Sequence, residues 1–198
     1  MDRLNVSALI LAKGHSRRLR GKNTKDFHGT PMFMVNVKKC LKIFDQVYVS
    51  SDDMEILNKA RLAGAIPIWR DEDLCGEVPN ITVYQHALKE MKDVDAIVAV
   101  QACSPTVSEL NIVRAKTLME IGYNEVMTCY PPVNKEIYHD QAFPIYGSIW
   151  AISKWKLENY EDPYKPEPEA LLVDSSVDIH NFRDYLKALR QAQRWQSM

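Results

Sequence analysis

The chain has 198 residues, of which 46% are apolar and 26% charged, and its net charge is -1. This composition is typical of a globular protein, and the length suits one buried core, so we expect a single domain over residues 1–198. The near-neutral charge argues against a general nucleic-acid binder, and no stretch is long and apolar enough for a signal peptide or a membrane span, which predicts a cytoplasmic protein without membrane contact.

The first predicted element is a strand over Val6–Leu11, and a basic loop follows it directly. From Lys13 to Lys25 six residues are Lys or Arg and none is acidic. A loop that leaves a buried strand lies at the carboxyl edge of the sheet, where open α/β folds bind ligands. Gly14 and Gly21 would let backbone N–H groups approach phosphate oxygens. The loop is therefore a candidate polyanion site, with a merely solvated surface loop as the alternative. Neither the P-loop nor the dinucleotide spacing of glycines is present.

Strands and helices alternate along the rest of the first two thirds of the chain. Apolar runs predict further strands at 46–50, 65–69, 95–100 and 125–129. Apolar residues at three- and four-residue steps predict helices at 32–44, 54–63, 81–91 and 109–121, with Ser108 as a cap of the last. This alternation predicts a three-layer α/β/α domain with a mainly parallel sheet.

The pattern weakens after Cys129, where prolines become frequent. One more strand is predicted at 145–153, a proline-rich acidic surface loop at 161–169 and a closing amphipathic helix at 181–195. The four cysteines show no paired spacing of the kind that binds zinc or forms a redox dithiol.

The order of residues in the basic loop resembles the signature of the acylneuraminate cytidylyltransferases, the CMP-sialic acid synthetases. The signature runs approximately Ala-Arg-Gly-Gly-Ser-Lys-Gly-Ile-Pro-x-Lys-Asn-x-Lys, and it aligns without a gap. The matching residues are Ala12, Gly14, Ser16, Lys22, Asn23 and Lys25. The resemblance implies a Rossmann-like nucleotidyltransferase domain with catalytic Lys13 and Lys22, and nucleotide-binding residues Ala12, Gly14, Ser16, Arg17 and Asn23.

Two later segments support the same register. Residues 45–53 resemble the end of the family's second strand, where capping of the next helix is the simplest role and Ser50 or Asp52 could also face the nucleotide. Residues 100–106 are similar to the family's Leu-Gln-Pro-Thr-Ser-Pro-Leu, which implies that Gln101 and Ser104 bind substrate. A Ser-Pro helix start is the alternative. Val107 replaces the arginine that follows in the family.

The segment Val177-Asp178-Ile179-His180 resembles the family's Ile-Asp-Ile-Asp, whose paired carboxylates hold Mg2+. The resemblance implies Mg2+ as cofactor and Asp178 as its catalytic ligand. His180 replaces the second aspartate, and imidazole is a poorer ligand for magnesium. Three readings stay open for that difference: one carboxylate suffices, Asp174 contributes, or catalysis is impaired. Asp178 could also be an ordinary residue before the last helix.

The region that would bind a sugar acid is the least similar to the family. It is compressed to about residues 131–144, where Lys135 is the basic residue that could bind a substrate carboxylate, or could simply be solvated. Asn80 is predicted to cap the helix that follows it. The shortened segment leaves a homodimer open.

The resemblance implies transfer of a cytidylyl group from CTP to a sialic-acid-like sugar acid, giving a CMP-sugar and pyrophosphate. No general base stands out in the sequence. One alternative keeps the fold but changes the substrate, to a Kdo-like, pseudaminate or legionaminate acid or another nucleotide. Another is a nucleotide-binding homologue with impaired catalysis, suggested by His180 and Val107.

Overall fold

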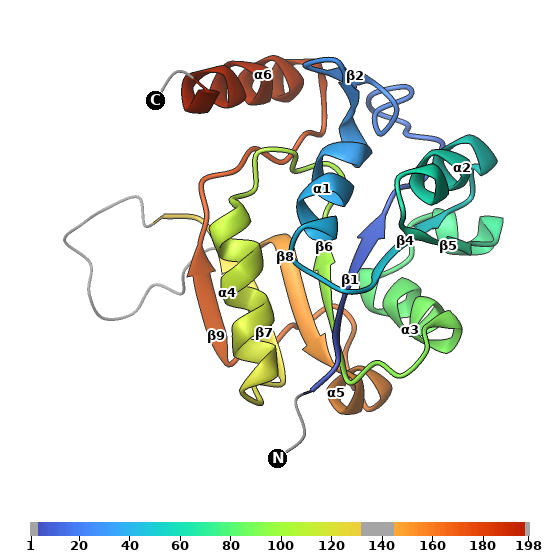
Figure 1. Ribbon diagram of the computed structural model, residues 1–198, viewed down its shortest axis with the longest axis vertical. Coiled ribbons are helices and arrows are strands. Elements are labelled where there is room, and N and C mark those ends of the chain that lie inside the picture. Colours follow the sequence, from blue (N-terminus) through green and yellow to red (C-terminus); the bar gives the residue numbers. More distant parts are fainter. Residues whose placement is uncertain (1–3, 132–144, 197–198) are drawn as a thin grey trace.

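The computed structural model describes residues 4–131 and 145–196, and these form a seven-stranded sheet covered by helices on both faces (Figure 1). The strand order is β5-β4-β1-β6-β8-β7-β9. Within this seven-stranded sheet only β8 runs antiparallel to its neighbours, β6 and β7. The strands are β1 (Val6–Leu11), β4 (Val47–Ser51), β5 (Ile66–Trp69), β6 (Ala96–Val100), β7 (Glu125–Cys129), β8 (Ile145–Ser153) and β9 (Ala170–Val173). The predicted mainly parallel α/β/α domain is confirmed.

Alternation along β1 separates the two halves of the core. Ala8 and Ile10 face one cluster of buried side chains and Leu9 faces the other, because successive strand residues point to opposite faces. The first cluster contains residues of α1 (Met32–Leu41), α2 (Met54–Leu62) and α4 (Glu109–Glu120). The second contains residues of α3 (Asn80–Glu90) and α5 (Lys154–Glu158). No helix of the described residues is both long and apolar enough to cross a bilayer.

A third, smaller cluster lies at the carboxyl edge of the central strands. It joins the hairpin of β2 (Asp26–Phe27) and β3 (Thr30–Pro31) to the closing helix α6 (Phe182–Gln196). Val177 and Ile179 are buried in this cluster, and Figure 1 shows α6 beside the hairpin at one end of the molecule. The cluster therefore brings the chain before α6 to the end of the sheet where the basic loop begins.

Helix starts were predicted with mixed success. The Asp53 carboxylate caps α2 by accepting from the backbone N–H groups of Glu55 and Ile56, and Ser108 caps α4. The prediction for Asn80 is wrong, because Asn80 is the first residue of α3 and Pro79 occupies the cap position without a side-chain bond. Proline is tolerated at this position because its φ is already fixed near the helical value and the N–H that it lacks would have no intrahelical partner there.

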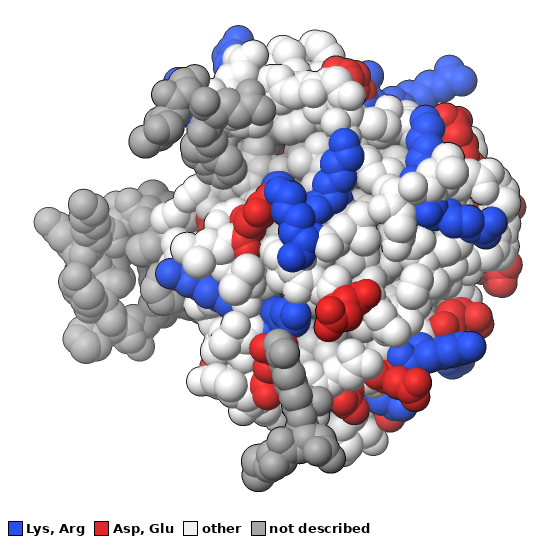
Figure 2. Space-filling view, in the orientation of Figure 1, with Lys and Arg blue, Asp and Glu red and all other residues white. Residues whose placement is uncertain are grey.

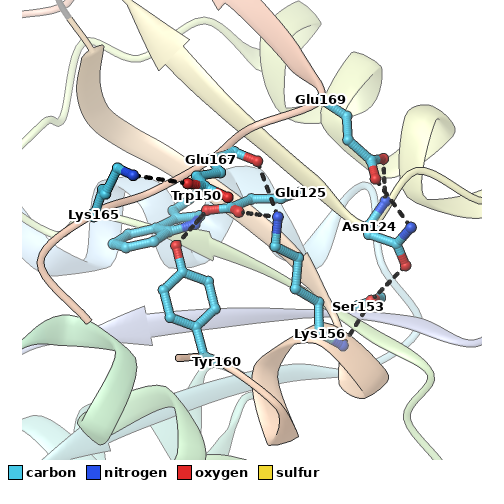
Figure 3. A network of polar contacts seen from close by, with 9 residues as sticks. All are labelled: Asn124, Glu125, Trp150, Ser153, Lys156, Tyr160, Lys165, Glu167 and Glu169. Carbon is cyan, nitrogen blue, oxygen red and sulfur yellow. Dashed lines mark hydrogen bonds and ion pairs between the residues drawn. The ribbon is translucent and has the colours of Figure 1, made fainter. Parts of the chain in front are cut away.

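The opposite edge of the sheet is held by a network around Glu125 (Figure 3). Its carboxylate is fully buried and accepts hydrogen bonds from Trp150 Nε1 at 2.8 Å and from the Tyr160 hydroxyl at 2.9 Å. Lys156 Nζ lies 2.6 Å from the other carboxylate oxygen. Because Glu125 begins β7, the network ties α5 and the segment after it to the amino edge of that strand.

The molecular face that carries α1 and α4 is evenly charged. Figure 2 shows Lys and Arg side chains interspersed with Asp and Glu side chains on that face, rather than gathered in one basic area. Mixed charge of this kind is typical of a solvated surface.

Candidate active site

Two adjoining pockets lie at the carboxyl edge of the sheet, next to the basic loop. The first, here named the loop pocket, has a volume of about 250 Å³, and the second, the sheet pocket, about 140 Å³. Both are lined by Lys13, Ser16, Lys22, Cys75 and Gly76. The loop pocket is also lined by Arg17, Arg18, Leu19, Glu77 and His180, and the sheet pocket also by Leu11, Asn23, Arg70, Leu74, Val78, Asn80, Val83, Gln101 and Cys103. Most of the predicted loop residues are therefore brought together.

Hydrogen bonds fix the basic loop in one shape. The Asn23 amide donates to the Lys13 carbonyl at 2.7 Å, across ten residues of chain, and Asn23 is almost fully buried. Gly21 has a φ of +62°, a conformation that glycine adopts without strain. The Asn23 side chain thus holds the two ends of the loop together, and the residue also lines the sheet pocket.

Close contact with the start of α2 explains the glycine at position 14. The Gly14 N–H donates to Asp52 Oδ1 at 2.7 Å. A Cβ at this position would lie 2.7 Å from Asp53 Cβ, well inside van der Waals contact. Asp52 therefore holds the loop against the end of β4. Ser50, the other residue that could have faced the nucleotide, is fully buried.

The loop pocket is strongly basic. Four of its lining residues are Lys or Arg (Lys13, Arg17, Arg18 and Lys22), and Glu77 is the acidic one. Arg17 lies 3.3 Å from Glu77, but both side chains are more than four-fifths exposed, so this ion pair is weak. The Lys22 ammonium donates to the Ile179 carbonyl at 2.7 Å, which joins the loop to the segment before α6. The lining of the pocket therefore carries an excess of positive charge.

Arg70, which the sequence analysis did not single out, is a further residue of the sheet pocket. It follows β5 directly and is only 4% exposed. Its Nε and Nη2 have no hydrogen-bond partner, and neither has the buried hydroxyl of Ser16 in the same pocket. Leaving such donors unpaired costs free energy that a ligand with acceptor oxygens would recover. The sequence does place Arg70 directly after a predicted strand, at the edge of the sheet where ligands bind, and this position could have marked it as a candidate.

Gln101 and Ser104 are placed differently. Gln101 lines the sheet pocket, and its Nε2 donates to the Tyr84 hydroxyl at 3.2 Å. Ser104 is fully buried, and its hydroxyl contacts the Tyr146 hydroxyl at 2.6 Å. Ser104 and the equally buried Ala12 thus line neither pocket and belong to the core beneath the site.

Asp178 lies next to the loop pocket with one oxygen free. His180 Nε2 is 2.7 Å from Asp178 Oδ2, while Asp178 Oδ1 is buried without a hydrogen-bond partner. Cys103 is close by, and burial, with the Asp178 charge as a smaller cause, raises the pKa of its thiol to about 12, so the thiol is neutral.

The structure removes one of the alternatives for metal binding. Asp174 accepts bonds from Asn111 on one oxygen, and from Ser148 and Ser176 on the other. Asp174 is thus a structural residue within the core. Among the described residues no three His, Cys, Asp or Glu side chains converge as a complete metal site. The free Asp178 oxygen therefore fits a divalent cation that brings further ligands with it, such as phosphate oxygens. Lys135 lies outside the described residues.

Comparisons with known proteins agree on one family. Residues 7–144 match the family model described as Cytidylyltransferase. A pseudaminic acid cytidylyltransferase from Campylobacter jejuni is 37% identical over 93 residues, which are 45% of this chain and 40% of the relative. A CMP-N,N'-diacetyllegionaminic acid synthase from Legionella pneumophila is 28% identical over 89% of this chain and 91% of its own length.

A solved structure shares the fold. The CMP:2-keto-3-deoxy-manno-octonic acid synthetase complexed with CTP has a TM-score of 0.74 at 15% identity, with 98% of this chain and 99% of that chain covered. The matches to the pseudaminic acid relatives span at most 40% of those proteins' length.

Proposed function

The chain belongs to the cytidylyltransferase family, and on that basis we propose that it transfers a cytidylyl group from CTP to a sialic-acid-like sugar acid. The observation that carries the proposal is the set of donors at the carboxyl edge of the sheet. Lys13 and Lys22 face both pockets, while Arg70 and Ser16 present buried donors without partners. A nucleoside triphosphate supplies the negative charge and the acceptor oxygens that these donors lack.

Each pocket is proposed to take a different part of the nucleotide. The loop pocket, with four basic side chains, suits the phosphates. The sheet pocket is smaller and is lined by Arg70 and Gln101, whose guanidinium and amide are planar groups that suit the edge of a base or the ribose hydroxyls. The relatives named for pseudaminic and legionaminic acid support a sugar acid as the second substrate.

The proposed reaction is a substitution at the α-phosphorus of CTP. The anomeric hydroxyl oxygen of the acid bonds to this phosphorus, the bond to the β-phosphate bridging oxygen breaks, and pyrophosphate leaves with that electron pair. The hydroxyl proton passes to solvent. Lys13 and Lys22 stabilise the negative charge that grows on the departing pyrophosphate, so positioning and electrostatics supply most of the rate.

Asp178 is the proposed ligand of a divalent cation, Mg2+ in the expectation from the sequence. Its buried Oδ1 without a partner supports this role, and so does its contact with His180, which lines the loop pocket. When bound, the cation adds positive charge at the phosphates. A cytoplasmic location and a homodimer belong to the same proposal.

Pyrophosphate release across a panel of substrates tests the function. The panel pairs CTP, UTP, ATP and GTP with N-acetylneuraminic, pseudaminic, legionaminic and 3-deoxy-manno-octulosonic acids. We expect turnover with CTP and one of the first three acids. Turnover with the octulosonic acid alone, or with another nucleotide, would favour the alternative substrates. CTP binding without turnover on any acid would favour a homologue that has lost catalysis.

A further inference from the structure

His180 stands where the family has the second aspartate of its metal-binding pair, and its imidazole is itself a metal ligand. We infer that His180 makes the cation site of this protein favour a first-row transition-metal dication, such as Co2+, over Mg2+. The inference rests on the proposed function, because the cation is taken to arrive with the nucleotide phosphates.

His180 and Asp178 already have nearly the separation that two ligands of one metal ion need. The two residues are two apart in the chain, and the contact between their side chains shows that both lie on the same side of this segment. Ile179 between them is buried on the other side, in the cluster with α6. His180 Nε2 is 2.7 Å from Asp178 Oδ2. Two ligands at right angles, each about 2.1 Å from a metal ion, are about 3 Å apart. The two donor atoms would therefore need to move apart by only a few tenths of an ångström, with both groups turned toward the ion.

Two other carboxylates of this part of the chain already accept hydrogen bonds. The Asp174 carboxylate accepts from Asn111, Ser148 and Ser176. Asp184 Oδ2 accepts from the backbone N–H groups of His180 and Asn181. Among the described residues in contact with Asp178, the imidazole of His180 is therefore the donor that suits such a cation.

This donor set changes which cation is preferred. Mg2+ takes oxygen ligands in a strict octahedron and gains little from an imidazole nitrogen. Affinity for nitrogen-containing sites rises from Mn2+ to Co2+ and beyond. Because two side chains cannot hold the ion alone, we expect the preference to appear in the complex with CTP rather than in the free protein.

The test measures cation competition and ligation in the complex with CTP, without sugar acid. Co2+ is the probe. Coordination of His180 predicts a hyperfine-shifted imidazole N–H proton resonance that disappears in His180→Asp. The preference for Co2+ over Mg2+, corrected for the preference of free CTP, is expected to fall about tenfold or more in the same variant, as when a metal site loses a nitrogen donor.

His28→Asn is the matched control. His28 lies between β2 and β3, contacts the Leu189 carbonyl and lines neither pocket. It also has a φ of +52°, which asparagine tolerates. This variant should keep both the shifted resonance and the cation preference.

The outcomes separate the inference from the function it rests on. If CTP binds with Co2+ but no shifted imidazole resonance is seen, or if His180→Asp leaves the cation preference unchanged, the inference is wrong and the proposed function stands. Absence of CTP binding with either cation contradicts both.

Discussion

At the scale of single residues, Lys22 is the basic side chain that joins the two parts of the site. It lines both pockets, and its ammonium donates to the Ile179 carbonyl. We expect Lys22→Ala to lower kcat/KM about 100-fold or more, the usual effect of removing one donor that stabilises transition-state charge. The loss of one hydrogen bond should change stability by only about 1 kcal/mol. Steady-state kinetics and thermal melts measure the two effects.

Arg20→Ala is the control for this experiment. Arg20 belongs to the same loop, but it is exposed and lines neither pocket. It should retain activity close to that of the parent protein. Equal losses of kcat/KM in the two variants would mean that the loop acts through its overall charge. Full activity in Lys22→Ala would contradict the assignment of Lys22 as a phosphate ligand.

Arg70 predicts opposite effects on stability and on binding. Its guanidinium is buried with two nitrogens unpaired, so replacing it by methionine should leave the free protein equally stable or make it more stable. CTP should bind at least about tenfold more weakly, since a hydrogen bond to a charged group is worth about 1.5–3 kcal/mol. The melting temperature with and without CTP reports both quantities.

Arg61→Met removes an exposed arginine of α2 and serves as the comparison. It should change neither quantity. A free Arg70→Met protein that is clearly destabilised would show that the guanidinium has a structural partner and is not reserved for a ligand.

The sequence predicted the residues of the site unevenly, and the reason is physical. Lys13, Lys22 and Asn23 lie close together in the chain, so the order of residues was enough to bring them into one loop. Arg70 was missed because its role depends on burial in the same pocket as Ser16, which lies far from it in the chain. Ser104 belongs to a matching motif, but its hydroxyl is buried against Tyr146. A motif gives the residue type but not the direction of its side chain.

At the scale of elements, the loop after β1 packs so closely against the start of α2 that position 14 has no space for a Cβ atom. We expect Gly14→Ala to destabilise the fold by about 1–3 kcal/mol, because its Cβ would overlap Asp53 Cβ. Asp53→Gly removes the opposing Cβ, and at a helix N-cap glycine costs only about a few tenths of a kcal/mol. The double variant should therefore recover most of the lost stability.

Urea denaturation of the two single variants and the double variant measures this coupling. Strong non-additivity is expected, as for residues in direct contact. Additive losses would indicate that the contact between the loop and α2 relaxes without cost.

Longer elements were predicted well because their patterns repeat. Residues 6–11, 125–129 and 145–153 were predicted as strands with their observed bounds, and α4 begins at its predicted cap. The two-residue strands β2 and β3 are too short to show alternation. β9 follows a proline-rich acidic segment and pairs with β7, 44 residues earlier at the first register pair, so its pairing depends on tertiary structure. The five-residue α5 likewise depends on packing rather than on helix propensity.

At the scale of the whole molecule, stability and activity depend on opposite edges of the sheet. Glu125 lies at the amino edge of β7, whereas both pockets lie at the carboxyl edge of the central strands. We expect Glu125→Ala to lower the free energy of unfolding by about 3–5 kcal/mol, since the Lys156 ammonium would lose its carboxylate within a buried network. Its KM for CTP should remain that of the parent protein below the melting temperature.

Glu125→Gln keeps an acceptor for Trp150 and Tyr160 but removes the charge that pairs with Lys156. It should destabilise less than the alanine variant. A large rise in the KM for CTP in either variant, measured while the protein is folded, would contradict the separation of the two edges.

The most direct test of the proposed cytidylyl transfer is a ³¹P NMR measurement with an acceptor acid carrying ¹⁸O in its anomeric hydroxyl. If that hydroxyl attacks the α-phosphorus, the three CTP resonances should give way to pyrophosphate and to a CMP-sugar diester whose phosphorus shows the isotope shift of a bonded ¹⁸O. Unchanged CTP resonances with every acid, or a diester without the shift while the labelled acid remains unexchanged, would contradict the mechanism.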